Sequence, residues 1–209
     1  MKPDIKDREI RTFELDEKSF ETREDGTRRI VGHAAVFNQW SEDLGGFREQ
    51  IAPGAFAEAI NADDVRALFN HDTNQVLGRN RSKTLTLLED SRGLMSEIIL
   101  PDTQLARDLE ALMKRGDINQ MSFAFSIDQD GQTWKKAGEG PWERTITKVS
   151  RLYDVSVVTF PAYPQTDAAV RAMRALEDAA ARDAREIAVP AAVAAMVQAQ
   201  RLRLLRIDL

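Results

Sequence analysis

Short runs of alternating or β-branched apolar residues, separated by turns, occupy most of the first 160 residues. A period of two residues is typical of a half-buried strand, and β-branched residues favour strands. Asp25-Gly26 separates the first two runs, so we expect those to form a hairpin or to lie as neighbouring strands. Strands are predicted at Glu9–Leu15, Arg29–Phe37, Val65–Phe69 and Met121–Asp128, and a long bent strand region at Glu143–Thr159.

A second hairpin and two helices are predicted in the middle of the chain. The turn-forming Asp90–Gly93 joins two apolar runs, Lys83–Leu88 and Leu94–Leu100. The residues of Ala55–Ile60 predict a short helix with Pro53 near its start. A longer helix begins after Pro101-Asp102-Thr103, stops at Gly116 and repeats its apolar residues at helical spacing at Leu105, Leu109, Leu112 and Met113.

The composition changes after Gln165, where Ala, Arg and Asp dominate. The composition of residues 167–188 predicts a helix, and Pro190 interrupts the helical pattern. A second stretch to Ile207 has one mostly apolar face. We therefore predict an α+β domain at residues 1–166, dominated by antiparallel strands, and a helical tail at residues 167–209 whose apolar face can dock a partner helix.

The composition limits the chemistry. The 209 residues include no cysteine and two histidines, His33 and His71, which excludes thiol nucleophiles and thiolate metal sites and makes a zinc enzyme a weak hypothesis. A hydroxyl nucleophile, an all-carboxylate site or no enzyme at all remain.

The net charge of -5 gives no support to a nucleic-acid partner. The amino terminus lacks the apolar core of a signal peptide, and no apolar run is long enough to span a bilayer, so we expect an intracellular protein away from membranes.

Ser122 lies in a strand whose two faces differ. Period-two alternation predicts that one face packs and that the other is shallow and hydroxylic, as a substrate cleft requires. The alternative is that Ser122 is merely a small residue on a half-exposed strand. The predicted packing face carries Met121, Phe123, Phe125 and Ile127, and the other face carries Ser122, Ala124 and Ser126.

His71 and Asp154 are candidates for a base and its orienting acid. His71 sits in a polar turn just after the apolar Val65–Phe69 run, where a catalytic base and a solvated histidine are both plausible. Asp154 interrupts an apolar strand, so its carboxylate needs a partner. That partner is either the base His71 or a cation, Lys148 or Arg151, in a salt bridge. A third possibility is that Asp154 lies on an edge strand and faces outward. His33, between small residues in a strand, is better explained as a packed histidine.

The chain resembles the prohead proteases of tailed phages, the serine proteases of capsid maturation that are similar to herpesvirus maturation proteases. The resemblance covers about residues 30 to 165. The segments that carry it are Gly32–Phe37, Ile51–Phe56, Leu68–Asp72, Val76–Arg79, Asp90–Leu94, the helix to Gly116, Met121–Phe125 and Asp154–Ala162.

The resemblance implies His71 as general base, Ser122 as nucleophile and Asp154 as the third member of a triad. Relatives often carry Glu in place of Asp154, and an aromatic residue in place of His33. The implied fold is an antiparallel β-barrel core surrounded by helices, as in the herpesvirus proteases. Arg79 is a candidate for a charge that supports the transition state.

The implied function is a serine endopeptidase that cleaves the scaffold segment of the phage major capsid protein, and the protease itself, during procapsid maturation. It implies a place inside the assembling procapsid in the host bacterial cytoplasm, with the tail at residues 167–209 as an interaction or encapsidation segment. We also expect self-association as a dimer, no cofactor or metal, and no nucleic acid or membrane partner. The competing hypothesis is a catalytically inactive capsid-assembly or scaffold-binding protein with the same fold. An unrelated ester hydrolase is disfavoured because the Gly-x-Ser-x-Gly elbow is missing.

Overall fold

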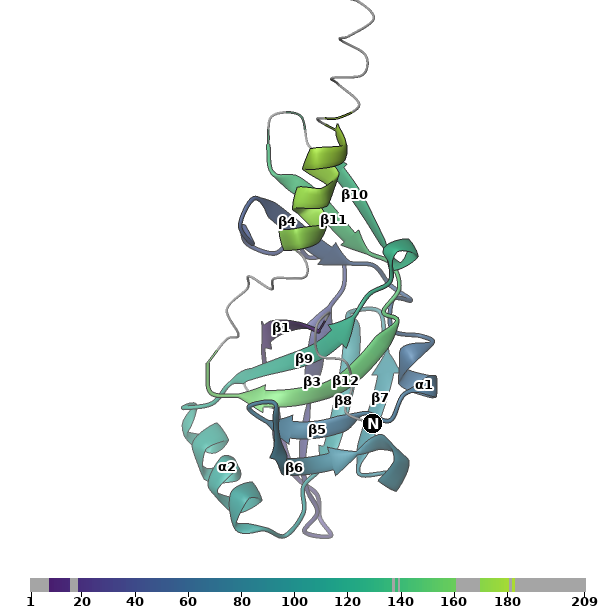
Figure 1. Cartoon of the computed structure of the whole chain (residues 1–209). Helices are drawn as coiled ribbons and strands as arrows, with labels where there is room; N and C mark the ends of the chain where they lie inside the picture. Colours follow the sequence, from purple (N-terminus) through teal and green to yellow (C-terminus); the bar gives the residue numbers. More distant parts are fainter. Residues whose placement is uncertain are drawn as a thin grey trace, which may run out of the picture. The chain divides into compact units, whose positions relative to one another are not determined.

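Strands in three sheets make up most of the first unit of the chain (Figure 1). The computed structural model describes residues 8–15, 19–136, 138, 140–160, 170–180 and 182. The chain divides into two compact units, residues 1–168 and 169–209. In the second unit, residues 170–180 form a helix, and the predicted helical stretch that ends at Ile207 lies outside the described residues.

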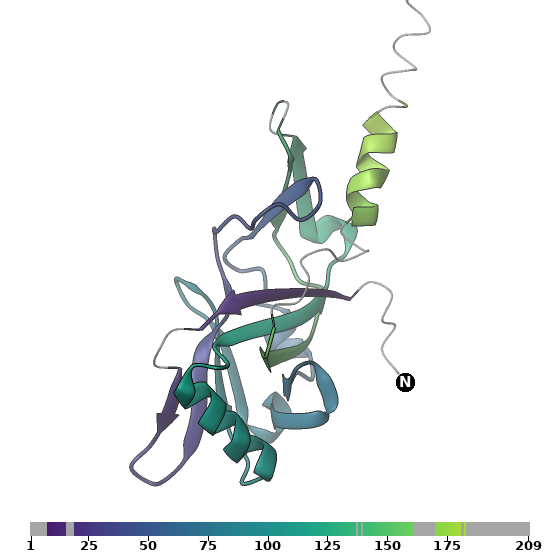
Figure 2. The same ribbon diagram turned by 90° about the vertical axis from the view of Figure 1, so that its left-hand side faces the viewer.

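The largest sheet has five strands in the order β1-β9-β12-β5-β6. β12 runs parallel to β5, and the other neighbours are antiparallel. Figure 2 shows β1 running alongside β9 at one edge of this sheet. The strands are β1 (Glu9–Glu14), β9 (Gln120–Ser126), β12 (Arg151–Val158), β5 (Arg66–Phe69) and β6 (Asp72–Arg79).

A second sheet of four antiparallel strands, in the order β2-β3-β8-β7, lies against the first. Contacts of β3 with β1 and β9, and of β6 with β8, bring the two sheets together. Phe123 is central to the core, because its ring stacks on Phe13 and Phe125 and meets Phe56 edge-on. The strands are β2 (Phe20–Thr22), β3 (Arg28–Val36), β8 (Gly93–Ile99) and β7 (Leu85–Glu89).

The third sheet has three strands, β10 (Gln132–Lys136), β11 (Trp142–Ile146) and β4 (Phe47–Ile51), in the order β10-β11-β4. β11 pairs antiparallel with β10 and parallel with β4. This sheet lies beyond one end of the two larger ones in Figure 1.

The predicted long helix is confirmed as α2 (Gln104–Arg115). The Thr103 side chain accepts a hydrogen bond from the Ala106 N–H, and Gly116 ends the helix in the left-handed region at φ 82°. The predicted Ala55–Ile60 helix is displaced, because residues 53–58 form turns and α1 covers Ala59–Ala62. Within the described part of the chain, no helix has the length and apolar character of a membrane span.

The expectation of a closed barrel surrounded by helices is wrong. The sheets are open: β1 and β6 are the edges of the five-stranded sheet, and β2 and β7 are the edges of the four-stranded sheet. A groove of about 760 Å³, lined in part by Gln39, Trp40 and Ser41, borders β1 where a closing strand would pair. The sequence correctly predicted an α+β fold dominated by antiparallel strands.

One pairing prediction and one prediction of a strand's extent are also wrong. β1 does not pair with β3; the Asp25-Gly26 turn instead joins β3 to β2, a strand that the sequence analysis missed, and the Asp25 carboxylate accepts the Thr27 N–H at 2.8 Å. The long strand region Glu143–Thr159 is two strands in different sheets, β11 and β12.

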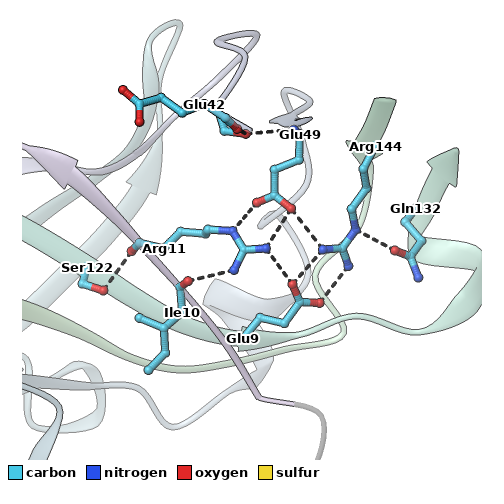
Figure 3. Close-up of polar contacts among 9 residues, drawn as sticks. Glu9, Ile10, Arg11, Glu42, Glu49, Ser122, Gln132 and Arg144 are labelled. Carbon is cyan, nitrogen blue, oxygen red and sulfur yellow. Dashed lines mark hydrogen bonds and ion pairs between the residues drawn. The ribbon is translucent and has the colours of Figure 1, made fainter. Parts of the chain in front are cut away.

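Four buried charges connect β1 to the three-stranded sheet (Figure 3). Glu9 and Arg11 come from β1, Glu49 from β4 and Arg144 from β11. Arg144 donates to both Glu9 carboxylate oxygens at 2.7 Å and to Glu49 Oε2 at 3.0 Å, while Arg11 binds Glu9 and both oxygens of Glu49. We call these four residues the charge cluster. Opposite charges balance within it, as buried ions require.

The charge cluster predicts acid sensitivity of the fold. Burial alone would raise the pKa of the Glu9 carboxyl, but the hydrogen bonds and charges of Arg144 and Arg11 outweigh burial and lower that pKa from its ordinary value of 4.5. Folded protein therefore binds fewer protons at Glu9 than unfolded protein does, so Glu9 stabilises the fold above about pH 4.5 and loses this contribution as pH falls through its lowered pKa. We expect the urea midpoint to fall more steeply between about pH 6 and about pH 3 in the wild type than in Glu9→Gln. Equal slopes would contradict this.

Candidate active site

Ser122 lies in β9, between β1 and β12, opposite Thr12 on one side and Ser156 on the other. The predicted packing face is confirmed, since Met121, Phe123 and Phe125 are all buried. The prediction that the other face is shallow and forms a substrate cleft is wrong at Ser122, which has 0% of its surface exposed. From Met121 to Phe125, both faces of the strand are covered.

A two-residue turn places His71. β5 and β6 pair up to Phe69 and Asp72, and Asn70 and His71 between them have φ values of 54° and 56°. Two successive left-handed residues are the geometry of a tight hairpin turn, which Asn tolerates well. The Asn70 N–H donates to Val157 O at 2.9 Å, and its side-chain oxygen accepts the Thr159 N–H at 2.9 Å. The turn is thereby attached to the end of β12.

The three predicted site residues meet in one hydrogen-bonded chain. His71 Nε2 is 2.8 Å from Ser122 Oγ, and His71 Nδ1 is 2.6 Å from Asp154 Oδ1. They come from β9, the β5–β6 turn and β12, which are neighbours in the same sheet. A serine, an imidazole and a carboxylate in this order have the geometry of an activated hydroxyl nucleophile.

An irregularity in β12 brings Asp154 to the face of Ser122. Leu152 pairs with Phe125 while Asp154 pairs with Ala124, so Tyr153 is an extra residue in the register. Without it, the period of two would place Asp154 on the core face with Leu152. Bulges of this kind redirect side chains beside active sites.

The Asp154 carboxylate has two further partners that the sequence analysis missed. Ser156 Oγ donates to Oδ1 at 2.7 Å, and Arg8 donates to Oδ2 at 2.8 Å. Ser156 follows Asp154 by two residues, so a shared strand face is a signal that sequence alone offers. The contact of Arg8, 146 positions away, leaves no such signal. The alternative partners Lys148 and Arg151 contact Glu58 and the Tyr153 ring instead.

The remaining candidates lie in other interactions. His33 Nε2 is 2.9 Å from an oxygen of Asp90, in agreement with a packed histidine. The Arg79 guanidinium binds both oxygens of Asp64, at 2.7 and 2.6 Å, and this hydrogen bonding lowers the pKa of Asp64 to about 2. Among the described residues, no group of three or more His, Asp or Glu side chains is arranged to hold a metal ion.

Comparisons with known proteins identify the family. The family model described as caudovirus prohead serine protease matches residues 13–180. The prohead protease of Enterobacteria phage HK97 is 32% identical over 172 residues, which cover 80% of this chain and 70% of that protein. The structure of the bacteriophage T4 capsid assembly protease aligns with a TM-score of 0.49 at 11% identity, over 72% of this chain and 96% of that one. The chain therefore belongs to the caudovirus prohead serine proteases.

Proposed function

We propose that this serine protease cleaves the scaffold segment of its phage's major capsid protein, and itself, inside the assembling procapsid. The observation that carries the proposal is the unbroken chain from Ser122 Oγ through His71 to Asp154, with contacts of 2.8 and 2.6 Å. Membership in the prohead protease family supports the capsid protein as substrate.

Each of the three side chains has one role in the proposed mechanism. His71 Nε2 takes the hydroxyl proton as Ser122 Oγ attacks the peptide carbonyl, and then gives that proton to the leaving amine. Water, activated by the same imidazole, hydrolyses the acyl-enzyme. Asp154 accepts the Nδ1–H, which holds the tautomer that leaves Nε2 free as a base and stabilises the imidazolium. Ser156 Oγ donates to the same Asp154 oxygen, Oδ1, at 2.7 Å and helps to hold the carboxylate in place.

The competing hypothesis, an inactive assembly protein, requires no such alignment. A fold kept only for binding has no need to hold an imidazole between a serine and a buried carboxylate. The three residues come from separate strands and turns, and the register irregularity at Tyr153 is needed to bring Asp154 into line.

Co-expression with the capsid protein tests the proposal. We expect wild-type chain to shorten the capsid protein, as measured by intact mass spectrometry, and Ser122→Ala to leave it at full length. Ser126→Ala, four residues along the same strand and outside the hydrogen-bonded chain of the site, is the matched control and should cleave as wild type does. Equal shortening by Ser122→Ala would exclude Ser122 as nucleophile, and no shortening by any form would favour the inactive assembly protein.

A further inference from the structure

The Ser122 hydroxyl is engaged by the neighbouring strand β1. Ser122 Oγ donates to the main-chain carbonyl of Arg11 at 2.8 Å (Figure 3). A carbonyl oxygen can only accept, and a serine hydroxyl carries a single proton. Arg11 O and His71 Nε2, each 2.8 Å from Ser122 Oγ, therefore compete for the one proton that the base must remove.

The residue before β1 reaches the other end of the site. The Arg8 guanidinium lies 2.8 Å from Asp154 Oδ2 and 3.5 Å from His71 Nδ1. Its positive charge offsets the charge of Asp154 and repels the positive charge that His71 acquires when it accepts the serine proton. Arg8 and Arg11 thus act against the same proton transfer from two sides.

Substrate has no access to the nucleophile in this arrangement. A scissile carbonyl must come within about 3 to 3.5 Å of the attacking oxygen, but Ser122 has 0% exposure. β9 has two neighbours, and β12 carries Asp154, so β12 must stay for catalysis. β1 is the neighbour whose departure opens the edge of β9, where an extended peptide can add as a strand.

β1 is held in place by contacts at a few of its residues. The charge cluster ties Glu9 and Arg11 to β4 and β11 (Figure 3), and Phe13 stacks on Phe123 in the core. The groove of about 760 Å³ beside β1, which Arg11, Phe13 and Glu49 help to line, leaves room for movement. The family model begins at residue 13, so Arg8 and the first four residues of β1 precede the matched segment.

We infer that residues 8–12 form an inhibitory strand that occupies the place of the substrate backbone beside Ser122, with the charge cluster as its anchor. The inference rests on the proposed function of Ser122, His71 and Asp154. Residues 8–12 move away from β9 on activation, while Phe13 stays packed in the core as the pivot. The three-stranded sheet is coupled to this movement, because β4 and β11 supply half of the anchor.

A reversible cross-link tests the inference, since the chain has no cysteine of its own. The Leu15 N–H donates to Asn119 O. Hydrogen-bonded and non-hydrogen-bonded pairs alternate in an antiparallel ladder, so Ile10/Ala124 and Glu14/Gln120 are non-hydrogen-bonded pairs, whose short separation suits a disulfide. Ile10→Cys/Ala124→Cys fastens the inhibitory strand, and Glu14→Cys/Gln120→Cys, beyond the pivot, is the matched control.

The readout is the rate at which a fluorophosphonate probe labels Ser122 in the purified full-length chain. We expect oxidised Ile10→Cys/Ala124→Cys protein to be labelled at least tenfold more slowly than the same protein after reduction, whereas the control protein is labelled equally in both states. Arg8→Ala should be labelled several-fold faster than wild type, because it releases one end of the strand.

The outcomes separate this inference from the proposed function. Labelling that is equally fast with and without the Ile10/Ala124 cross-link, or slower labelling of Arg8→Ala, would overturn the inhibitory strand and leave the protease assignment standing. A third outcome is that no protein without a closed cross-link is labelled, Arg8→Ala included, while co-expressed capsid protein is still shortened. The inhibitory role is then wrong, because Arg8→Ala should expose Ser122 to the probe. If no form is labelled and no capsid protein is shortened, the proposed function fails and this inference fails with it.

Discussion

Replacement of Asp154 by Asn is expected to lower the rate constant of capsid-protein cleavage by about 10⁴-fold, the size of effect seen when a triad aspartate becomes an amide. In the proposed mechanism, the carboxylate oxygen 2.6 Å from His71 Nδ1 accepts the Nδ1–H and so keeps Nε2 unprotonated toward Ser122. An asparagine NH₂ in its place donates to Nδ1 and favours the opposite tautomer, which cannot act as a base. The cleavage rate in procapsids, followed by intact mass spectrometry, measures the effect.

Ser156→Ala is the matched control for this prediction. Ser156 contacts the same Asp154 oxygen at 2.7 Å and is equally buried, but its loss removes one neutral donor and keeps the carboxylate. A hydrogen bond to a charged group contributes about 1.5 to 3 kcal/mol, and only the part that affects the orientation of Asp154 reaches the rate. We therefore expect a fall of about tenfold or less. Equal, small effects of both substitutions would remove Asp154 from the triad.

Local sequence pattern predicted the elements better than it predicted their pairing. The alternation at residues 9–15 and the helical spacing before Gly116 depend on a few neighbouring residues, and β1 and α2 appear where expected. The partner of β1 is β9, more than 100 residues away, and no local pattern records it. Sequence neighbours usually pair, which is why we expected β3.

The long bent strand region predicted at residues 143–159 shows a different limit. Its apolar pattern continues without a turn signal, yet the chain changes sheets between Ile146 and Arg151. The cause is a main-chain corner, where the Thr147 and Lys148 N–H groups both donate to Gly131 O. A Cβ at Gly131 would lie 2.3 Å from Lys148 O, so the corner depends on that glycine. The corner thus depends on a residue outside residues 143–159, and the sequence of that region gives no sign of it.

The candidate site was predictable for reasons that do not extend to its partners. With no cysteine and two histidines, the chain offered few bases, and the family resemblance selected His71, Ser122 and Asp154, which the structure places together. The contacts of Arg8 and of the Arg11 carbonyl depend on which strand lies beside β9. Because the pairing of β1 with β9 was not predicted, the contacts of Arg8 and of the Arg11 carbonyl at the site were missed as well.

Arg144→Met is expected to lower the free energy of unfolding by about 3 to 5 kcal/mol, the cost of breaking a buried ion pair from one side. The Arg144 side chain is 1% exposed and makes three contacts with Glu9 and Glu49. Methionine fills much of its volume, but it leaves the two buried carboxylates with Arg11 as the cation within the charge cluster. Urea unfolding can be followed by tryptophan fluorescence, since the Arg144 guanidinium lies over the Trp134 ring.

Lys114→Met is the control, because Lys114 is a 57% exposed cation that pairs with Glu110 one helical turn away. Such pairs contribute about 0.5 kcal/mol or less. A similar loss in both variants would show that the charge cluster does not stabilise the fold in solution. Glu9→Gln combined with Arg144→Met should cost less than the sum of the single changes, because each single change leaves an opposite charge uncompensated and the double variant removes both. Additive costs would mean that Glu9 and Arg144 do not interact, and the anchor of the inhibitory strand would then lack its connection to β11.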